Sequence, residues 1–228
     1  MISPVKVPPL IRDNLVLNFD PSRGYSPANG VNGILDLSNY GTTIILSNNI
    51  SYSGNPIAYY ASTATSYLEF NTTVSATTFG TGDFTMSWWF YSTNYSAGSH
   101  ILFDGRTTTS LSSCFAVGIN STGFPYLYSI SIVLKSSNSI MLNKWQYVVL
   151  SRIGGIIYFY INGVVSGSAT YNFNIDSTNI HVWIGKNASG GNAGIIGGIG
   201  QVLIYKGLGL TQNQVTQNFN ATRFYYGV

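Results

Sequence analysis

Charged side chains are scarce in this chain of 228 residues. Asp, Glu, Lys and Arg together make up 7% of it, against about 25% in an ordinary soluble domain. The polar surface must therefore be built from Ser, Thr, Asn and Gly, which associate through hydrogen bonds instead of keeping molecules apart by charge. Such a surface suits a protein packed into an assembly. The composition argues against the alternative, a disordered chain, because 45% of the residues are hydrophobic and 14% are aromatic.

A basic cluster is also missing. Ten basic and seven acidic residues give a net charge of +3 and a pI near 8.9, but these residues are scattered singly. No run of Lys or Arg and no stripe of Arg and aromatic residues is present that could grip a phosphate backbone. We therefore expect no nucleic-acid partner.

The chain has a single cysteine and no long apolar run. Cys114 alone excludes an intrachain disulfide and a CxxC metal or redox motif, and we interpret it as a small buried hydrophobe. The opening stretch MISPVKVPPL lacks the apolar core of a signal peptide, and no run of about 18 apolar residues could cross a bilayer. We expect synthesis in a cytoplasm without a signal peptide, release by a route such as lysis, and no membrane insertion.

Short strand-like segments fill most of the chain. Spacers rich in Gly, Ser, Thr and Asn separate them at intervals of roughly 8–15 residues, which is typical of a sandwich or barrel. The candidate strands are 15–19, 43–46, 67–70, 84–91, 99–104, 115–120, 126–132, 146–153, 156–162, 164–168, 181–185 and 197–206. No break in composition divides residues 14–228, so we expect one domain there. Residues 1–13, with two adjacent prolines, are predicted to form an extended arm that could reach a neighbouring subunit, with terminal disorder as the alternative.

The stretch GGIIYFYINGVVSGSA predicts a tight hairpin. Asn162-Gly163 is the preferred pair for a two-residue type I′ turn, because both positions require a positive φ. The six residues 156–161 before the turn are all apolar or aromatic. A strand without a polar face must be covered on both sides, which predicts a central position between two layers.

The segment FTMSWWFY at 84–91 alternates in a way that predicts two faces. One face is expected to fill the sandwich core, with Phe84, Met86, Trp88 and Phe90. The other face is amphipathic and partly open to solvent or to a partner, with Thr85, Ser87, Trp89 and Tyr91. Because 17 Tyr and 4 Trp exceed what the core requires, Trp89 and Tyr91 are the best candidates for a ligand or partner surface. The alternative is that a strand or loop covers them.

One short helix is predicted close to the end of the chain. Thr211 can cap it and Gln214, three residues on, completes a capping box. Val215 and Phe219 then share one face at a spacing of four residues. We expect this helix to lie on the sandwich.

These segments, taken together, resemble the concanavalin A-like lectin/glucanase superfamily, especially its laminin G-like jelly-roll modules, from about residue 14 to residue 226. The blocks that carry the resemblance, in order, are NLVLNFDPSRGYSPANG with ILDLSNYG, GDFTMSWWFYS, ILFDGR, KWQYVVLSRIGGIIYFYINGVVSGS, and HVWIGKN with GGIGQVLIYKGLGLTQNQV. The resemblance implies an all-β fold, an antiparallel β-sandwich (concanavalin A-like jelly roll) with one short C-terminal helix. The ending LTQNQVTQNFNATRFYYG resembles the tail of such modules in bacteriophage particle proteins.

The sequence lacks the closely spaced acidic residues that glycoside hydrolysis requires. A glycoside hydrolase of this superfamily needs carboxylates close together, which its retaining glucanases carry as Glu-x-Asp-x-x-Glu. Glu69 and six Asp residues are the only acids, and no two of them lie within four residues of each other. Four aspartates lie at strand ends beside Pro, Gly or Ser, where we interpret them as turn or loop caps: Asp20, Asp36, Asp83 and Asp104. His100 and His181 are isolated and are interpreted as satisfied surface or edge histidines.

Some laminin G-like modules hold calcium at the rim of the sandwich with a carboxylate and carbonyl oxygens. In this chain Asp104 of FDGR is the nearest candidate ligand, with Asn192 as a possible oxygen donor. Calcium is the one cofactor that the resemblance leaves open.

Three functions follow, because the superfamily holds lectins, glycosidases, adhesion modules and structural domains. The first is a non-enzymatic structural or decorating protein of a virion, associated with the capsid or tail of a phage, with other virion proteins and further copies of itself as partners. The alternative is a carbohydrate-binding adhesion module that recognises host-surface glycans. The third and weakest is a glycoside hydrolase, because the acidic motif is absent.

Overall fold

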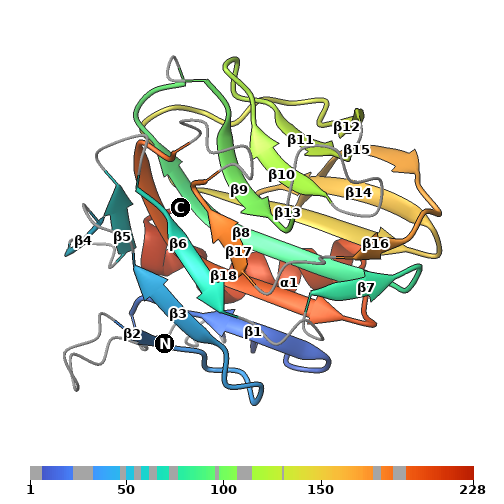
Figure 1. Cartoon of the computed structure of the whole chain (residues 1–228), viewed down its shortest axis with the longest axis horizontal. Coiled ribbons are helices and arrows are strands. Elements are labelled where there is room, and N and C mark those ends of the chain that lie inside the picture. Colours follow the sequence, from blue (N-terminus) through green and yellow to red (C-terminus); the bar gives the residue numbers. More distant parts are fainter. Residues whose placement is uncertain are drawn as a thin grey trace, which may run out of the picture.

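Two antiparallel sheets of short strands face each other across an apolar interior (Figure 1). The computed structural model describes residues 7–22, 33–46, 50–53, 58–61, 66–71, 77–95, 98–106, 115–129, 131–176, 181–186 and 194–228. Every strand pair between described strands is antiparallel. The predicted all-β antiparallel sandwich with one short C-terminal helix is confirmed.

The first sheet carries the helix on its outer face, and we call it the helix-covered sheet. Its strand order is β15 (Val164–Thr170), β14 (Ile156–Ile161), β13 (Gln146–Ile153), β8 (Phe84–Ser92), β18 (Gly197–Lys206), β5 (Ala58–Ala61) and β4 (Ile50–Ser53), with β1 (Leu15–Phe19) also paired to β18.

The second sheet packs against the inner face of the first, and we call it the opposite sheet. Its strand order is β12 (Ile132–Lys135), β11 (Pro125–Tyr128), β10 (Ala116–Ile119), β9 (His100–Asp104), β17 (His181–Ile184), β6 (Leu68–Asn71), β3 (Thr43–Leu46) and β2 (Gly33–Leu35). A separate two-stranded ribbon joins β16 (Ile175–Asp176) to β7 (Thr78–Gly80).

The core between the sheets contains the predicted face of β8. Phe84, Met86, Trp88 and Phe90 are fully buried at 0% exposure and belong to one cluster with Phe103 of the opposite sheet. Alternation along β8 places these four side chains on one face, and burial of each contributes about 1.5–3 kcal/mol. This part of the sequence prediction is confirmed.

The predicted hairpin forms between β14 and β15. Asn162 and Gly163 have φ values of 51° and 83°, and the Asn162 side-chain oxygen accepts a hydrogen bond of 2.8 Å from the backbone N–H of Tyr147. The predicted central position is wrong, because β14 lies next to the edge strand β15. Its outer face is covered only in part, since Tyr160 is 2% exposed and Ile156 is 37% exposed.

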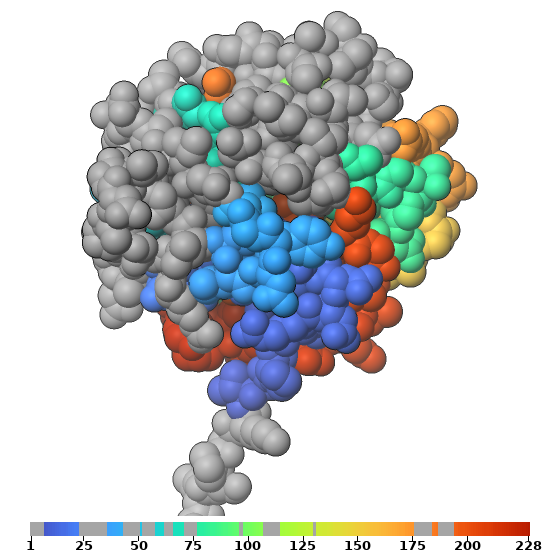
Figure 2. Space-filling view, turned by 60° about the horizontal axis from the view of Figure 1, so that its bottom comes forward, coloured from blue at the N-terminus to red at the C-terminus, as the bar shows by residue number. Residues whose placement is uncertain are grey.

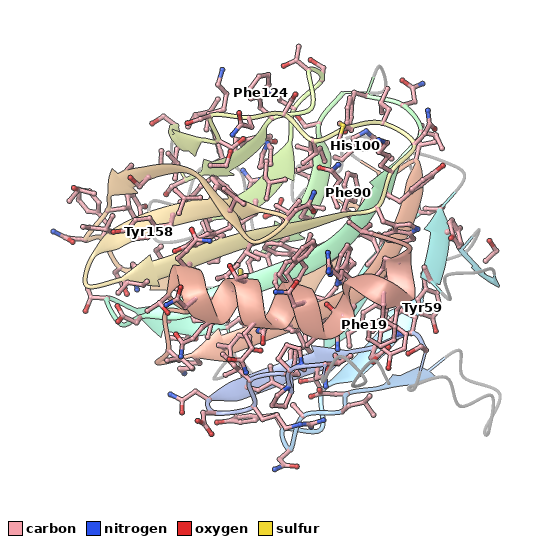
Figure 3. All side chains as sticks on the ribbon, turned by 180° about the vertical axis from the view of Figure 1, so that it is seen from behind. Phe19, Tyr59, Phe90, His100, Phe124 and Tyr158 are labelled. Carbon is pink, nitrogen blue, oxygen red and sulfur yellow. The ribbon has the colours of Figure 1, made fainter. Side chains whose placement is uncertain are left out.

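Helix α1 (Gln212–Thr222) begins after Thr211, where the predicted capping box is present. The Gln214 side chain accepts a 2.9 Å hydrogen bond from the Thr211 backbone N–H. Val215 and Phe219 are buried against the outer face of the helix-covered sheet. Figure 3 shows from behind how the helix lies across this sheet. A 3-10 turn, η2 (Arg223–Tyr226), follows directly. Within the described part of the chain, no helix is long and apolar enough to span a membrane.

The described part of the predicted N-terminal arm lies against this helix. Asn218 accepts a hydrogen bond of 3.0 Å from the backbone N–H of Ile11, and Gln217 donates one of 2.8 Å to the carbonyl of Pro9. The Tyr205 hydroxyl donates to the Ile11 carbonyl at 2.9 Å. Residues 7–12 are thus held by their own domain, and residues 1–6 lie outside the described part.

A buried arginine closes one end of the core. Arg152 of β13 is 0% exposed, and its guanidinium lies 5.1 Å from the ring centre of Phe84. It donates hydrogen bonds to the carbonyl oxygens of Gly80 at 2.6 Å, Gly82 at 2.9 Å and Phe173 at 2.9 Å. This side chain therefore ties the chain around the β7–β16 ribbon to the sandwich.

Candidate functional site

The interpretation of Trp89 as part of an exposed recognition surface is wrong. Its side chain is 0% exposed and lies under α1 and η2. The indole stacks on Tyr226 with ring centres 4.3 Å apart and on Phe219 at 5.8 Å, and its N–H donates a 2.9 Å hydrogen bond to the Thr222 hydroxyl. The helix covers the outer face of β8, which carries both polar and aromatic residues. Trp89 is the side chain on this face that packs against the helix.

Tyr91 lies at the margin of the same covered face. Its side chain is half-buried, and its ring centre lies 5.6 Å from that of Trp145. Tyr60 approaches the same indole at 6.3 Å, and burial, followed by the neighbouring Tyr91, raises the pKa of Tyr60 above its ordinary value. Because Tyr91 retains some exposure, its role in recognition stays a prediction.

Asp104 does not fit the predicted calcium site. It is 0% exposed, and both of its carboxylate oxygens accept hydrogen bonds from the Arg106 guanidinium, at 2.8 Å and 2.6 Å. Burial alone would lower the pKa of Arg106, but its hydrogen bonds and its charge interaction with Asp104 outweigh burial and raise it. A calcium ion would have to displace this guanidinium. Asn192, the second predicted donor, lies outside the described residues.

Among the residues that the structure describes, no group of three or more His, Cys, Asp or Glu side chains could hold a metal ion. His100 is buried, and its two ring nitrogens lie 2.9 Å and 2.7 Å from the carbonyl oxygens of Gly194 and Asn94. The interpretation of His100 as a surface or edge histidine is wrong, because it is 0% exposed and belongs to the inner strand β9. A neutral imidazole carries one ring N–H and donates to one of these two carbonyls. The side chain of His181 lies outside the described part.

The interpretation of the strand-end aspartates as caps is confirmed. Each of the four carboxylates accepts at least one backbone N–H; the pairs are Asp20 with Ser22, Asp36 with Asn18, Ser38 and Thr42, Asp83 with Gly154, and Asp104 with Arg106. These carboxylates hold turns and loops in place.

The fold brings two acids into one row, which the sequence did not indicate. Trp183 of β17 pairs with Glu69 on one side and with Asp104 on the other. Two strand spacings separate these acids, about 10 Å between backbones, whereas paired catalytic carboxyls lie about 5–9.5 Å apart. Because Arg106 occupies both oxygens of Asp104, the described acids in this row do not form a catalytic pair.

A groove opens where residues 7–12 meet the C-terminal segment 221–226. Residues 7–10 form one wall, and Phe224 and Tyr225 of η2 form the other. Figure 2 shows the N-terminal segment in blue beside the C-terminal residues in red. Phe224 is 53% exposed and Tyr225 is 43% exposed, with ring centres 3.8 Å apart. This pair forms an exposed aromatic wall.

The floor of the groove is polar. Asn18, Asp20 and Gln201 are 3%, 9% and 6% exposed. The Gln201 side-chain nitrogen donates a 3.0 Å hydrogen bond to the Asn18 side-chain oxygen. Asp20 accepts hydrogen bonds from the backbone N–H of Ser22 at 3.0 Å and from its hydroxyl at 2.6 Å. The groove therefore combines aromatic faces with fixed amide and carboxylate groups.

A glycine in β18 makes this floor possible. A Cβ added to Gly200 would lie 2.4 Å from the ring of Tyr226, so only glycine lets this ring lie flat against the strand. The Tyr226 hydroxyl accepts a 2.7 Å hydrogen bond from the Gln201 backbone N–H. Burial raises the pKa of Tyr226 well above its ordinary value, the Gln201 N–H opposes this rise, and the negative charge of Asp20 adds to it.

A sequence comparison decides the family. The family model described as the concanavalin A-like lectin/glucanases superfamily matches residues 62–216. The chain belongs to this superfamily. No curated protein sequence matches the chain.

Solved structures agree with the superfamily fold. The binding domain of Paraclostridial Mosquitocidal Protein 1 is 19% identical with a TM-score of 0.71, over 95% of this chain and 55% of that one. The botulinum neurotoxin serotype D/C binding domain is 16% identical with a TM-score of 0.68, over 92% and 52%. The botulinum neurotoxin serotype D ligand-binding domain in complex with N-acetylneuraminic acid is 15% identical with a TM-score of 0.68, over 95% and 54%. The superfamily member described here thus spans about half the length of these chains, and the likeness shows the fold.

Sequence reasoning missed the groove. Asn18 and Gln201 are 183 residues apart along the chain, so no local pattern joins them. The aromatic run at 224–226 is the one local signal for this surface. In this superfamily member the groove arises only because the fold brings residues 7–12 and 221–226 together.

Proposed function

We propose that this chain is a non-enzymatic structural or decorating protein of a bacteriophage particle, built on a lectin-like β-sandwich. The observation that carries the proposal is that the described strand-end aspartates are all engaged in hydrogen bonds within the domain. Each strand-end aspartate holds a turn or a loop, and Asp104 is bound to Arg106 at both oxygens. Carboxylates fixed in this way support a role in binding and assembly.

The composition and the surface support the placement in a particle. A chain with 7% charged residues has little charge repulsion to keep copies apart. Large apolar side chains are also exposed along one side of the sandwich, where Ile132 of β12 is 60% exposed and Val164 and Val165 of β15 are 65% and 42% exposed. Such residues suit contacts with other virion proteins and with further copies of this chain.

The C-terminal tail supports the phage context. The residues that resemble phage particle proteins form α1 and η2, which close the outer face of the helix-covered sheet over Trp89. The resembling segment is therefore an integral part of the domain.

Purified particles test this proposal. Quantitative mass spectrometry should find the chain in a fixed copy number that matches the symmetry of the capsid, neck or tail. Particles that lack the chain, or that carry it in variable trace amounts, would contradict the proposal.

A second candidate function is a carbohydrate-binding adhesion module for host-surface glycans. Two observations favour it. The similar solved structures include binding domains, one of them in complex with N-acetylneuraminic acid, and the groove presents aromatic rings beside fixed polar groups. A glycan array probed with and without calcium tests it, and we expect saturable binding that does not depend on calcium. An array without saturable binding would contradict this function and leave the structural role standing.

A further inference from the structure

We infer that the groove between residues 7–10 and the C-terminal turn binds an uncharged hexopyranose ring of a glycan. The ring would stack on the Phe224–Tyr225 wall while its hydroxyls bond to the amides of the floor. This inference rests on the second candidate function and deepens it by naming the site and the class of sugar.

The aromatic wall supplies the stacking surface. Phe224 and Tyr225 are exposed by 53% and 43%, although both lie on a turn whose next residue, Tyr226, is 7% exposed. Tyrosine joins an apolar face to a polar tip, which matches the apolar C–H face and polar rim of a pyranose. The wall therefore offers contacts for both parts of the sugar.

The floor supplies directed hydrogen bonds. The bond between Gln201 and Asn18 uses the Gln201 nitrogen and the Asn18 oxygen. The Gln201 oxygen and the Asn18 nitrogen remain as one acceptor and one donor. A sugar hydroxyl can both donate and accept, so it can bond to either. Because the two amides hold each other in place, little side-chain entropy is lost when a ligand binds.

The charges in the groove favour a neutral sugar. Asp20 lines the groove as a buried residue and Arg12 lines it as an exposed one. A sugar carboxylate reaching the floor would face Asp20 at close range in a partly buried site, where repulsion is strong. The groove encloses about 810 Å³, within the range of roughly 300–1,000 Å³ of small-molecule sites.

Calorimetric titration of the full chain with lactose, cellobiose and maltose tests the inference, with 3′-sialyllactose as the acidic counterpart of lactose. We expect at least one neutral disaccharide to bind more tightly than 3′-sialyllactose. Tyr225→Ala should weaken that binding about tenfold, whereas Tyr225→Phe, which keeps the ring, should stay within about threefold. Tyr40→Ala is the matched control, because Tyr40 is 56% exposed and does not line the groove.

The possible results distinguish an error in the proposed binding site from an error in the proposed adhesion function. Saturable glycan binding that Tyr225→Ala leaves unchanged, in a variant that melts like the parent chain, would overturn the groove as the site and keep the adhesion function. Tighter binding of 3′-sialyllactose than of all three neutral disaccharides would overturn the uncharged class. Failure to bind any sugar here, together with an array without saturable binding, would overturn the adhesion function itself.

Discussion

The indole ring of Trp89 lies against the phenol ring of Tyr226, with ring centres 4.3 Å apart and planes inclined by 18°. Trp89 belongs to the central strand β8 and Tyr226 is the last residue of η2, so this stack joins the middle of the sheet to the end of the chain. Thr222, in the same C-terminal segment as Tyr226, accepts a hydrogen bond from the Trp89 indole N–H through its hydroxyl. The segment therefore closes the outer face of the sheet as one unit.

This stack predicts a large loss of stability when it is removed. Tyr226→Ala should lower the free energy of unfolding by about 3–5 kcal/mol, as for other buried aromatic side chains. Tyr226→Phe keeps the stack and loses the bond from the Gln201 N–H, and should cost about 1–2 kcal/mol. Urea unfolding followed by tryptophan fluorescence checks both values, and equal losses in the two variants would contradict the dominant role of the stack.

Gly200 provides a second check of the same contact. Gly200→Ala places a methyl group where the Tyr226 ring lies, and we expect a loss of about 1–3 kcal/mol from overpacking. In the Tyr226→Ala background the same substitution should cost much less, because the ring that it meets is gone. Additive losses would show that the two residues do not interact.

The bond between Asp104 and Arg106 predicts that calcium has no effect on stability through this site. Asp104→Asn should lower the free energy of unfolding by about 3–5 kcal/mol, because it leaves a buried guanidinium without its counter-charge. The melting temperature of the parent chain should be the same in calcium and in a chelator. A calcium-dependent rise in the melting temperature that disappears in Asp104→Asn would restore the calcium interpretation.

The buried guanidinium of Arg152 predicts a stability loss that lysine does not repair. Arg152→Met removes the donor of bonds to three carbonyl oxygens, and each carbonyl left without a partner costs about 1–3 kcal/mol. Arg152→Lys should recover only a small part, since one ammonium lacks the planar fork of donors. Hydrogen exchange should rise first at the β7–β16 ribbon, and unchanged protection there would contradict the anchoring role.

Buried tyrosines predict unfolding at alkaline pH. Burial raises the pKa of Tyr147 to about 12 and raises the pKa values of Tyr205 and Tyr226 further. A tyrosine in an unfolded chain has a pKa of about 10. Below about pH 9 both states hold these protons, so the tyrosines leave stability independent of pH. Above about pH 10 only the unfolded state loses them, and stability should fall by up to about 1.4 kcal/mol per tyrosine per pH unit.

A tyrosinate absorbance titration checks this expectation. The buried tyrosines should ionise together with unfolding, in a transition steeper than that of one group. Gradual ionisation of all tyrosines near pH 10 with the fold retained would contradict it.

The local pattern of the sequence determined the elements of this protein. Alternation along 84–91 identified the core face of β8, Asn162-Gly163 identified a turn with two positive φ values, and Thr211 with Gln214 identified the start of α1. Each of these depends on neighbours within a few residues, whose spacing fixes side-chain direction and backbone angle.

Only the tertiary structure decided what covers each face and which distant residues meet. Periodicity places Trp89 on the outer face of β8, but it carries no information about a helix formed more than a hundred residues later. Asn18 and Gln201 became one floor because β1 pairs with β18. Asp104 pairs with Arg106 because the fold buries its carboxylate, and a buried negative charge requires a neighbouring positive charge. Packing across long sequence separations decides these contacts, and the sequence pattern specifies only the surfaces that take part in it.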